Sequence, residues 1–530
     1  MSWERRVLCA WLAGLAFVVA TAPAPSAQGS GAQVRVVGYL KAPNPGEDDH
    51  LSAGSALTGV GLAISRDGST LAVSAPGEDS AARGTNGSQS DNSASDAGAV
   101  YVFSRAGAAW AQQAYIKASN PQSSDSFGFA VALSGDGDTL AVSANFEDSA
   151  ATGIDGNQAD QSAQGSGAVY VFARSGAAWS QQAYIKPSNT DADDRFGYSV
   201  SLSDDGHTLA VGAIGEDSTA TGINGNQADN AAAQAGAVYV FTRAGTRWSH
   251  QAYIKPSNTG GGDMFGFCLS LSADANTLAV CGYDEDSSAQ GIDGDQASNA
   301  SNGSGAAYVF VRSGGAWAQQ AYVKASNTTL QGAFGSAIVL SGDGDTLVVC
   351  ALDEDGLNPG VDAAEWQADR KPEERTRVAE DSAGAVYVYT RSGNRWAFQS
   401  YIKSSNIRAN DYFGLRLALS HDGNVLAAGA SQQPGGGAGI NPDRADASVP
   451  ESGAVYLFTR RGGRWAQSAY LKAPNAQEYD LFGSGVALSG DGRTLAVGAM
   501  GEDSAADGID GNQADNSTRD SGAIYLYAQP

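Results

Sequence analysis

The sequence predicts an all-β protein, a seven-bladed β-propeller of four-stranded blades closed by a strand from the N-terminus. Three observations predict this fold. The chain repeats every 69 residues, each repeat holds four strand-like segments, and the last repeat lacks its fourth segment.

The dipeptide Phe-Gly gives the period. It begins at Phe127, Phe196, Phe265, Phe334, Phe413 and Phe482, with spacings of 69, 69, 69, 79 and 69 residues. A further unit, 69 residues before Phe127, has Thr58-Gly59 in place of Phe-Gly. Seven units at a nearly constant spacing predict a repeat architecture rather than a row of independent domains.

Each unit contains four segments of strand length. In the second unit they read "FGFAVALS", "DTLAVSA", "GAVYVFAR" and "AWSQQAYIK", rich in β-branched and aromatic residues and separated by Gly, Asp and Ser. Across the tight Asp136-Gly137 turn, Val131 is expected to face Val142. We place the propeller at 36–530, with blades at about 55–117, 124–186, 193–255, 262–324, 331–403, 410–472, and 479–530 completed by 36–41.

The N-terminal phrase "GYLK" (38–41) explains how the ring closes. It matches the fourth-strand phrase "AYLK" (469–472), whereas the seventh unit ends after its third strand at "GAIYLYAQP". We therefore expect residues 36–41 to complete the last blade and to cover its open edge. The alternative is that the phrase is a degenerate leftover of a repeat.

The chain begins like an exported protein. Arg5 and Arg6 precede a fourteen-residue apolar run (7–20) and the small residues "TAPAPSAQ", so 1–27 predict a signal peptide and 28–35 a short linker. A buried N-terminal helix is the alternative. We expect a secreted, periplasmic or cell-surface protein without a transmembrane segment after signal removal. The net charge of −25 argues against nucleic acid as a partner.

The phrases "FGFAVALSGDG", "LAVSAPGEDS" and "GAVYVF" resemble the FG-GAP repeats of integrin α-chain N-terminal propellers and of many bacterial secreted proteins. The resemblance covers all seven units and implies adhesion or ligand binding outside the cell. Integrin-like repeats often carry a calcium loop between the first two strands. Here that turn is shortened to "SGDGDT" (134–139), which holds too few oxygen ligands, so this site is not carried over.

A second acidic phrase recurs in the long loop between the second and third strands, as in "EDSAATGIDGNQADQ" from Glu147. Oxygen side chains spaced around a glycine suit Ca²⁺, the one cofactor that the sequence suggests. They equally suit Asx-turns that fold the loop on itself. The candidate ligands are Asp155, Asn157, Asp160, Asn224, Asn226, Asp229, Asp510, Asn512 and Asp515.

The long loop of the fifth unit is ten residues longer and reads "AAEWQADRKPEERTR" (363–377). Trp366 beside Arg370 and Lys371 suits a binding hot spot on the face that carries the long loops. The alternative is a solvated insertion without a binding role.

Three cysteines follow the predicted signal peptide. The hairpin register pairs Cys268 with Cys281, which predicts either a disulfide or two small buried thiols. Cys350 is expected to be a buried free thiol.

The sequence contains no recognisable catalytic motif, and its long loops mostly repeat one phrase. We expect a monomeric, non-enzymatic scaffold that binds an extracellular protein or glycan. The alternatives are a propeller enzyme, a hydrolase or lyase acting on glycans or lipids, and a purely structural envelope protein.

Overall fold

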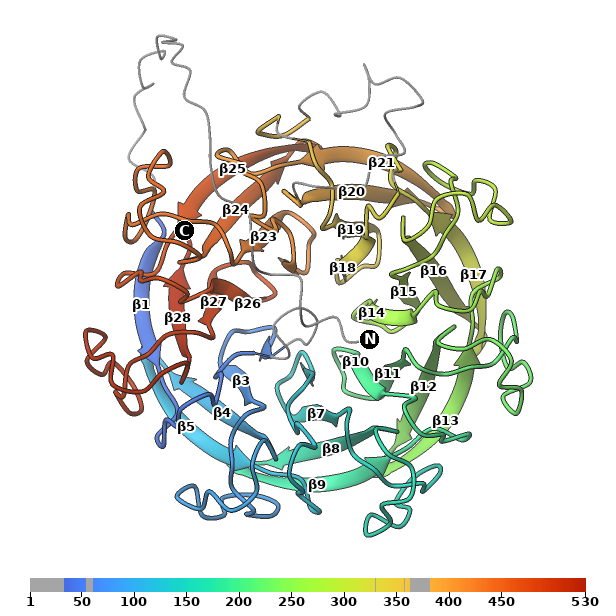
Figure 1. Ribbon diagram of the computed structural model, residues 1–530, viewed down its shortest axis with the longest axis horizontal. Helices are drawn as coiled ribbons and strands as arrows, with labels where there is room; N and C mark the ends of the chain where they lie inside the picture. The colour runs from blue at the N-terminus through green and yellow to red at the C-terminus, as the bar shows by residue number, and fades with distance from the viewer. Residues whose placement is uncertain (1–32, 54–60, 329, 357, 363–381) are drawn as a thin grey trace, which may run out of the picture.

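The computed structural model describes residues 33–53, 61–328, 330–356, 358–362 and 382–530, which form seven four-stranded antiparallel sheets arranged in a ring (Figure 1). Each sheet is one blade, with its first strand nearest the axis and its fourth strand on the rim. The predicted seven-bladed propeller is confirmed. The part of the chain described here contains no helix that is long and apolar enough to cross a membrane.

The strands follow the same order in every blade. Blade 1 holds β2 (Leu62–Ile64), β3 (Thr70–Ala75), β4 (Ala99–Ala106) and β5 (Ala109–Ile116); blade 2 holds β6 (Val131–Leu133), β7 (Thr139–Ala144), β8 (Ala168–Ser175) and β9 (Ala178–Ile185). Blade 3 holds β10 (Phe196–Leu202), β11 (Thr208–Ala213), β12 (Ala237–Ala244) and β13 (Arg247–Ile254); blade 4 holds β14 (Phe265–Leu271), β15 (Thr277–Gly282), β16 (Ala306–Ser313) and β17 (Ala316–Val323). Blade 5 holds β18 (Phe334–Leu340), β19 (Thr346–Ala351), β20 (Ala385–Ser392) and β21 (Arg395–Ile402); blade 6 holds β22 (Arg416–Leu419), β23 (Val425–Ala430), β24 (Ala454–Arg461) and β25 (Arg464–Leu471). Blade 7 holds β26 (Phe482–Leu488), β27 (Thr494–Ala499), β28 (Ala523–Ala528) and β1 (Arg35–Leu40).

The closing strand lies where the sequence places it. β1 pairs with β28 in an antiparallel register that sets Tyr39 opposite Tyr525 and Leu40 opposite Ile524 (Figure 1). Lys41 follows β1 directly, and its Nζ lies 2.9 Å from Oε2 of Glu502 in the buried interior of blade 7. The two ends of the chain therefore meet in one sheet, and the prediction that the N-terminal segment completes the last blade is confirmed.

The start of blade 1 differs from the prediction. The Ser52 N–H donates to the Ser74 carbonyl (2.8 Å), as the Gly128 N–H of Phe127-Gly128 donates to the Ser143 carbonyl (2.8 Å) in blade 2. Ser52 has a φ of 81°, close to the 101° of Gly128. Leu51-Ser52 thus occupies the Phe-Gly position, seven residues upstream of the predicted Thr58-Gly59, which lies outside the described residues. Leu51-Ser52 therefore departs from the 69-residue period, because this unit has seven more residues than the others between the Phe-Gly position and the second strand.

Neighbouring blades cover each other's apolar faces by packing large side chains on small ones. The small face of blade 2, with Ala130 and Ala141, contacts the bulky face of blade 3, with Leu209 and Val211. Packing of this kind buries both faces of every sheet, so a blade is stable only between two neighbours.

A polar contact reinforces these interfaces near the rim. The Trp248 Nε1–H donates to Oε1 of Gln182 in the preceding blade (2.9 Å), and the Arg243 guanidinium lies 5.4 Å from the centre of the Trp248 ring. The same tryptophan–glutamine contact recurs in the pairs Trp179–Gln113, Trp317–Gln251, Trp396–Gln320 and Trp465–Gln399. The regular tryptophans are therefore inter-blade packing residues. The contact is missing between blades 6 and 7. Ser468 replaces the glutamine in blade 6, and β1, which is the fourth strand of blade 7, has no tryptophan.

The tight turns between the first and second strands are joined around the axis. Arg66 N–H donates to Gly135 O, Asp136 N–H to Asp204 O, Asp204 N–H to Ala273 O, Ala273 N–H to Gly342 O, Gly342 N–H to His421 O, His421 N–H to Gly490 O, and Gly490 N–H to Arg66 O. These seven bonds form a closed ring that visits every blade. The Arg66 guanidinium, from blade 1, also lies 2.8 Å from the Asp204 carboxylate of blade 3. A Cβ at Gly342 would lie 2.1 Å from the His421 ring, so any side chain there would require this ring to move.

Removing the closing strand is expected to destabilise the whole ring. A chain that begins at residue 42 loses the β1–β28 pairing and leaves Glu502 buried without its lysine, and breaking a buried ion pair alone costs about 3–5 kcal/mol. Thermal unfolding should show a much lower melting temperature than for a chain that begins at residue 28. A chain that begins at residue 34, which keeps all of β1, is the control. Equal melting of all three chains would contradict the closure.

Candidate functional site

The two long connections of each blade lie together on one face of the ring. The link that leads into blade 3 contacts the long loop of blade 2, since Asp193 N–H donates to Gln164 O (2.8 Å) and Phe196 N–H donates to Ser166 O (2.9 Å). We call this side the long-loop face. The tight turns lie on the opposite, tight-turn face.

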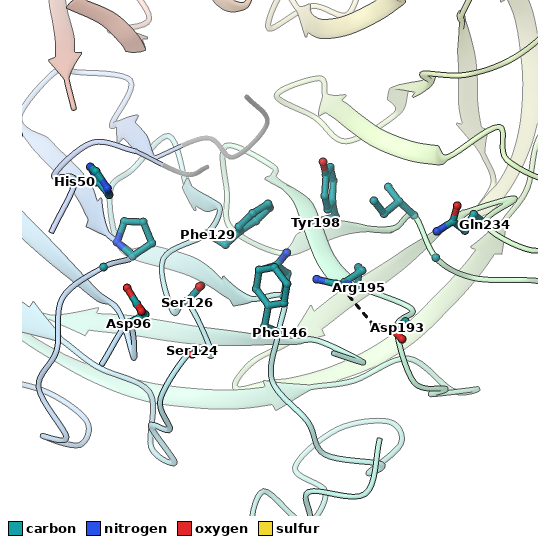
Figure 2. A pocket seen from close by; sticks show the side chains of 15 residues that line it. His50, Asp96, Ser124, Ser126, Phe129, Phe146, Asp193, Arg195, Tyr198 and Gln234 are labelled. Carbon is teal, nitrogen blue, oxygen red and sulfur yellow. Dashed lines mark hydrogen bonds and ion pairs between the residues drawn. The ribbon is translucent and has the colours of Figure 1, made fainter. Parts of the chain in front are cut away.

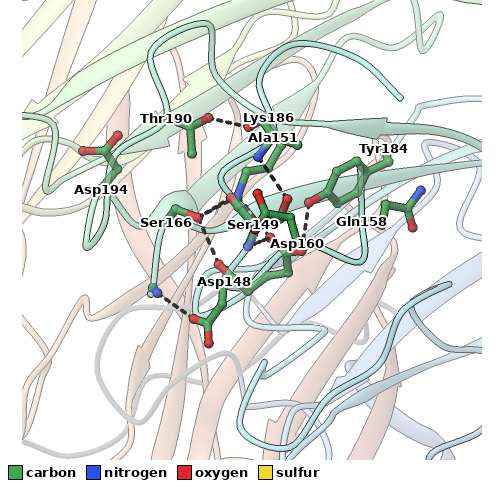
Figure 3. Close-up of polar contacts among 12 residues, drawn as sticks. Asp148, Ser149, Ala151, Gln158, Asp160, Ser166, Tyr184, Lys186, Thr190 and Asp194 are labelled. Atoms are coloured by element: carbon green, nitrogen blue, oxygen red, sulfur yellow. Dashed lines mark hydrogen bonds and ion pairs between the residues drawn. The ribbon is translucent and has the colours of Figure 1, made fainter. Parts of the chain in front are cut away.

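In six of the seven blades, a buried lysine–glutamate pair holds the long loop against its blade. In blade 2, Lys186 Nζ lies 3.0 Å from Oε2 of Glu147, and the Tyr184 hydroxyl donates to Oε1 of Glu147 (2.8 Å). Asn120, from the preceding link, donates to the same oxygen (3.1 Å). The Lys186 ammonium also donates to Ser166, and Figure 3 shows both residues beside Tyr184. The corresponding pairs are Lys41–Glu502, Lys117–Glu78, Lys255–Glu216, Lys324–Glu285 and Lys403–Glu354.

Blade 6 departs from this pattern, because Gln433 occupies the glutamate position. The Lys472 ammonium is fully buried, and it donates to Ser452 Oγ (2.6 Å) and to Oε1 of Gln433 (3.3 Å). Burial lowers the pKa of Lys472 to about 7, and the charge of Arg408 adds to this shift, whereas the charges of Asp411, Asp446 and Asp480 oppose it. Blade 6 thus carries a buried lysine without an adjacent carboxylate.

The candidate calcium ligands accept hydrogen bonds from N–H groups of the adjoining fourth strand or of their own loops. Asp155 Oδ1 accepts the Tyr184 N–H (3.0 Å), and Asn157 and Asp160 accept the N–H groups two residues ahead (both 3.1 Å). The equivalent residues repeat these contacts, as when Asn224 Oδ1 accepts the Tyr253 N–H (2.9 Å) and Asp510 Oδ1 accepts the Tyr39 N–H (3.0 Å). Asn226, Asn512 and Asp515 accept N–H groups two residues ahead, and Asp229 accepts from Thr219. The bonds to N–H groups two residues ahead are those of the Asx-turn alternative, whereas Asp155, Asn224 and Asp510 tie the loop to the fourth strand. No group of three acidic, histidine or cysteine side chains placed to hold a metal occurs in the described ranges. Calcium binding stays a prediction.

Cys268, Cys281 and Cys350 are free thiols in this structure. The register of β14 and β15, with Leu269 opposite Val280, brings Cys268 next to Cys281, and Cys268 Sγ donates to the Gly335 carbonyl (3.1 Å). Burial raises the pKa of the Cys281 and Cys350 thiols well above its ordinary value, which makes both inert as nucleophiles. The Cys268–Cys281 disulfide stays a prediction.

Trp366, Arg370 and Lys371 lie outside the described residues, so their predicted role as ligand contacts is neither supported nor opposed here. What the structure does add is a different set of non-repeated residues on the same face.

A cavity of about 870 Å³ opens on the long-loop face across blades 1 to 3 (Figure 2). Its wall includes Phe146, Arg195 and Tyr198, which come from the long loop of blade 2, the link into blade 3 and β10. At the position of Phe146, three other blades carry a glycine: Gly77, Gly215 and Gly501. The cavity is therefore built at positions where the units differ from one another.

Aromatic rings form the inner wall of this cavity and continue beyond it. The Phe129 ring lies 6.4 Å from the Phe146 ring and 5.3 Å from the Tyr198 ring, and Phe267 follows at 5.4 Å from Tyr198. Phe267 in turn stacks on Tyr283, with ring centres 4.4 Å apart. Neighbouring blades thus share one aromatic arc around the axis. Phe146 is its exposed end, with 38% of the residue accessible.

Polar groups surround the exposed ring. The Arg195 guanidinium lies 4.3 Å from the centre of the Phe146 ring and 3.4 Å from the Asp193 carboxylate (Figure 2). Asn145 is almost fully buried, yet its Oδ1 has no hydrogen-bond partner among the described residues, and neither has Nδ1 of His50. Both residues line the cavity. Buried polar atoms are normally paired, so these two are candidates for contact with a ligand.

Beneath the cavity, two buried carboxyls fix the links. Asp125 and Asp194 stand two residues before a Phe-Gly pair, and they accept the N–H groups of Gln122 (3.1 Å) and Asp191 (2.9 Å). Burial raises the pKa of each to about 8, so both are largely protonated at neutral pH. They support the links that carry Ser126 and Arg195.

Sequence reasoning missed this cavity because it treated the long loops as copies of one phrase. The informative signal lay at the edges of that phrase, in the residues just after the second strand and just before Phe-Gly. A comparison of the units at these positions would have singled out Phe146 and Arg195.

Comparisons with known proteins agree with the architecture. A family model for the FG-GAP repeat matches residues 110–172, 179–241 and 465–527. Each match begins at the tryptophan of a fourth strand and ends in the third strand of the next blade, so the sequence repeat is offset from the blade by one strand. No curated protein matches the chain.

Among solved structures, the chain is similar to the β-propeller domain of Cps50 (Swd1) from Myceliophteria thermophila, with 10% identity, 88% of this chain and 96% of that chain covered, and a TM-score of 0.45. It is also similar to the RRP9 WD40 repeats, with 10% identity, 93% and 97% covered, and a TM-score of 0.45. The periplasmic gluconolactonase PpgL of Pseudomonas aeruginosa matches with 16% identity, 79% and 86% covered, and a TM-score of 0.40.

A change at Asp155 separates a turn-forming role from a calcium-binding one. Asp155→Ala removes the acceptor for the Tyr184 N–H and is expected to lower the free energy of unfolding by about 1 kcal/mol, equally in EDTA and in calcium. Asp155→Asn keeps the acceptor, as Asn224 does in blade 3, and should leave stability unchanged. Thermal unfolding in both buffers measures this. A loss for Asp155→Asn that appears only with calcium would instead establish a metal site.

Restoring the missing carboxylate in blade 6 is expected to stabilise the protein. Between pH 7 and about 10.5, Lys472 is protonated in the unfolded chain but largely neutral in the folded protein. The free energy of unfolding therefore rises with pH in this window. Gln433→Glu should raise the pKa of Lys472, flatten this rise, and add roughly 1.5–3 kcal/mol at pH 7, as for a hydrogen bond to a charged group. Urea unfolding from pH 6 to pH 10 tests it, with Gln432→Glu as the control. An unchanged pH profile for Gln433→Glu would refute this account of Lys472.

Proposed function

Because the chain is a β-propeller built from FG-GAP repeats, we propose that it is a secreted, periplasmic or cell-surface scaffold that binds an extracellular protein or glycan without catalysing a reaction. The long-loop face is the binding face in this proposal. Its ligand lies in the cavity between blades 1 and 3.

One observation carries the proposal. The non-repeated residues Phe146, Arg195 and Tyr198 converge on one cavity, although each lies in a unit that otherwise copies its neighbours. Packing explains the repeated residues, since they form the same contacts in most blades. It does not explain an exposed phenylalanine at a position where other blades have glycine. Binding residues concentrate on loops that a rigid scaffold positions.

The two faces of the ring differ in a way that supports this choice. On the tight-turn face the backbone bonds of the turns close around the axis, and the turns are short and similar in sequence. On the long-loop face the lysine–glutamate pairs of six blades fix the bases of their loops and leave the loop edges free to vary. Export of the chain rests on the predicted signal peptide at 1–27, and the net charge of −25 suits a protein that does not bind nucleic acid.

The proposal is tested by affinity capture from the extracellular fraction or envelope of the source cells, with the full exported chain immobilised. Phe146→Ala combined with Arg195→Ala should abolish capture of the specific partner, because it removes the exposed contacts of the cavity. Phe398→Ala is the matched control, since Phe398 is also exposed (41%) but lies on the rim strand β21.

Two results would overturn the proposal. One is a partner whose capture survives the double change but is lost on changing the tight-turn face. The other is turnover of a glycan or lipid substrate by the purified chain, which would establish the enzyme alternative.

A further inference from the structure

We infer that the cavity between blades 1 and 3 binds a neutral hexopyranose unit of a glycan. The inference rests on the proposed function and deepens it by naming the class of ligand. It is drawn from the apolar surface, the unpaired polar atoms and the charge of the cavity wall.

The wall offers an apolar surface of the kind that a sugar ring covers. A pyranose has one face of C–H groups, which packs on an aromatic ring, and a rim of hydroxyl groups. Phe146 presents its ring to the cavity with 38% of the residue exposed, and Arg195 lies against it at 4.3 Å. Phe129 contacts Phe146 from behind, at 6.4 Å between ring centres, and is itself only 5% exposed. The exposed ring is therefore held rigidly, which keeps the entropic cost of binding low.

The polar groups around this ring fit hydroxyl groups. A hydroxyl both donates and accepts, so one group can satisfy an unpaired acceptor and a nearby donor together. Asn145 Oδ1, buried and unpaired among the described residues, requires a donor. Among the described side chains, the Asp193 carboxylate is bonded only by the long 3.4 Å contact to Arg195, which leaves acceptor capacity on the carboxylate and donors on the guanidinium. Planar acceptors and donors beside an apolar ring match the alternating C–H and O–H groups of a sugar.

The charge of the wall distinguishes a neutral sugar from an acidic one. Among the described residues that line the cavity, Arg195 is the one with a guanidinium, whereas Asp96 and Asp193 contribute two carboxylates. The whole chain carries a net charge of −25. A uronate or sialate would meet two carboxylates for one arginine, and like charges in a partly buried site repel. A neutral hexopyranose meets no such penalty.

The size of the cavity agrees with this class of ligand. Its volume of about 870 Å³ falls in the range of roughly 300–1,000 Å³ that small-ligand sites occupy. The cavity opens on the long-loop face, so a sugar unit can enter while it remains attached to a longer chain.

Saturation-transfer NMR on the full exported chain tests the inference. The probes are the methyl glycosides of glucose, galactose, mannose and N-acetylglucosamine, with methyl glucuronide as the charged comparison. We expect transfer to at least one neutral glycoside and weaker transfer to the glucuronide. Phe146→Ala and Arg195→Ala should each weaken binding by about tenfold or more, as for hot-spot residues, whereas Phe398→Ala should leave it unchanged. Thermal unfolding of each variant shows that the propeller is intact.

Three outcomes overturn the inference: no transfer to any neutral glycoside, transfer that Phe146→Ala leaves unchanged, or tighter binding of the glucuronide. Failure here is distinguishable from failure of the scaffold proposal. If a partner captured through Phe146 still binds after its glycans are removed enzymatically, the ligand is a protein, and only the glycan inference falls.

Discussion

Ring closure is the constraint on which the rest of the structure depends. Each blade has two apolar faces that only its neighbours can cover, so an open ring would leave two faces and a strand edge in water. The chain meets this constraint by sending β1 to the last blade. The closing strand also completes the buried polar cluster of blade 7, through Tyr39 and Lys41 on Glu502. One short segment thus completes a sheet, covers an edge and anchors the long loop of blade 7.

The buried lysine–glutamate pairs are costly elements, because taking two charges out of water opposes folding. Their value lies in specificity. Glu147 accepts hydrogen bonds from a tyrosine of the fourth strand, from the lysine that follows this strand and from an asparagine of the preceding link. These three contacts fix the position of the long loop. Loops held in this way can differ at their edges without moving. The cavity of blades 1 to 3 arises from such differences, since Phe146 and Arg195 flank segments that are otherwise repeated.

The architecture could be predicted because the same pattern of strands and turns recurs in every unit of the sequence. The Phe-Gly period, the four segments and the orphan phrase "GYLK" each pointed to the same ring, and the structure confirms the pairing of β1 with β28. Single departures were harder to predict. Leu51-Ser52 was missed because an insertion broke the period, and Ser52 adopts a positive φ that glycine normally supplies. Gln433 and Phe146 were missed because their roles become clear only when each is compared with the residue at the same position in the other blades. The effect of having glutamine or phenylalanine at these positions can be seen only when the surrounding contacts are known.

The ring of turns on the tight-turn face gives the molecule a second closure, independent of the first. Blades 1 and 7 are joined at the rim by β1 and again at the axis, where Gly490 donates to the Arg66 carbonyl. Fraying of one blade at the rim leaves the axial ring intact, and each of the seven turn amides is held by a different blade. These amides therefore form one cooperative unit, whose exchange with solvent deuterium requires an opening of several blades together. We therefore expect the persistence of the folded propeller to be governed by the slow rate of that concerted opening, not by the local stability of its weakest blade.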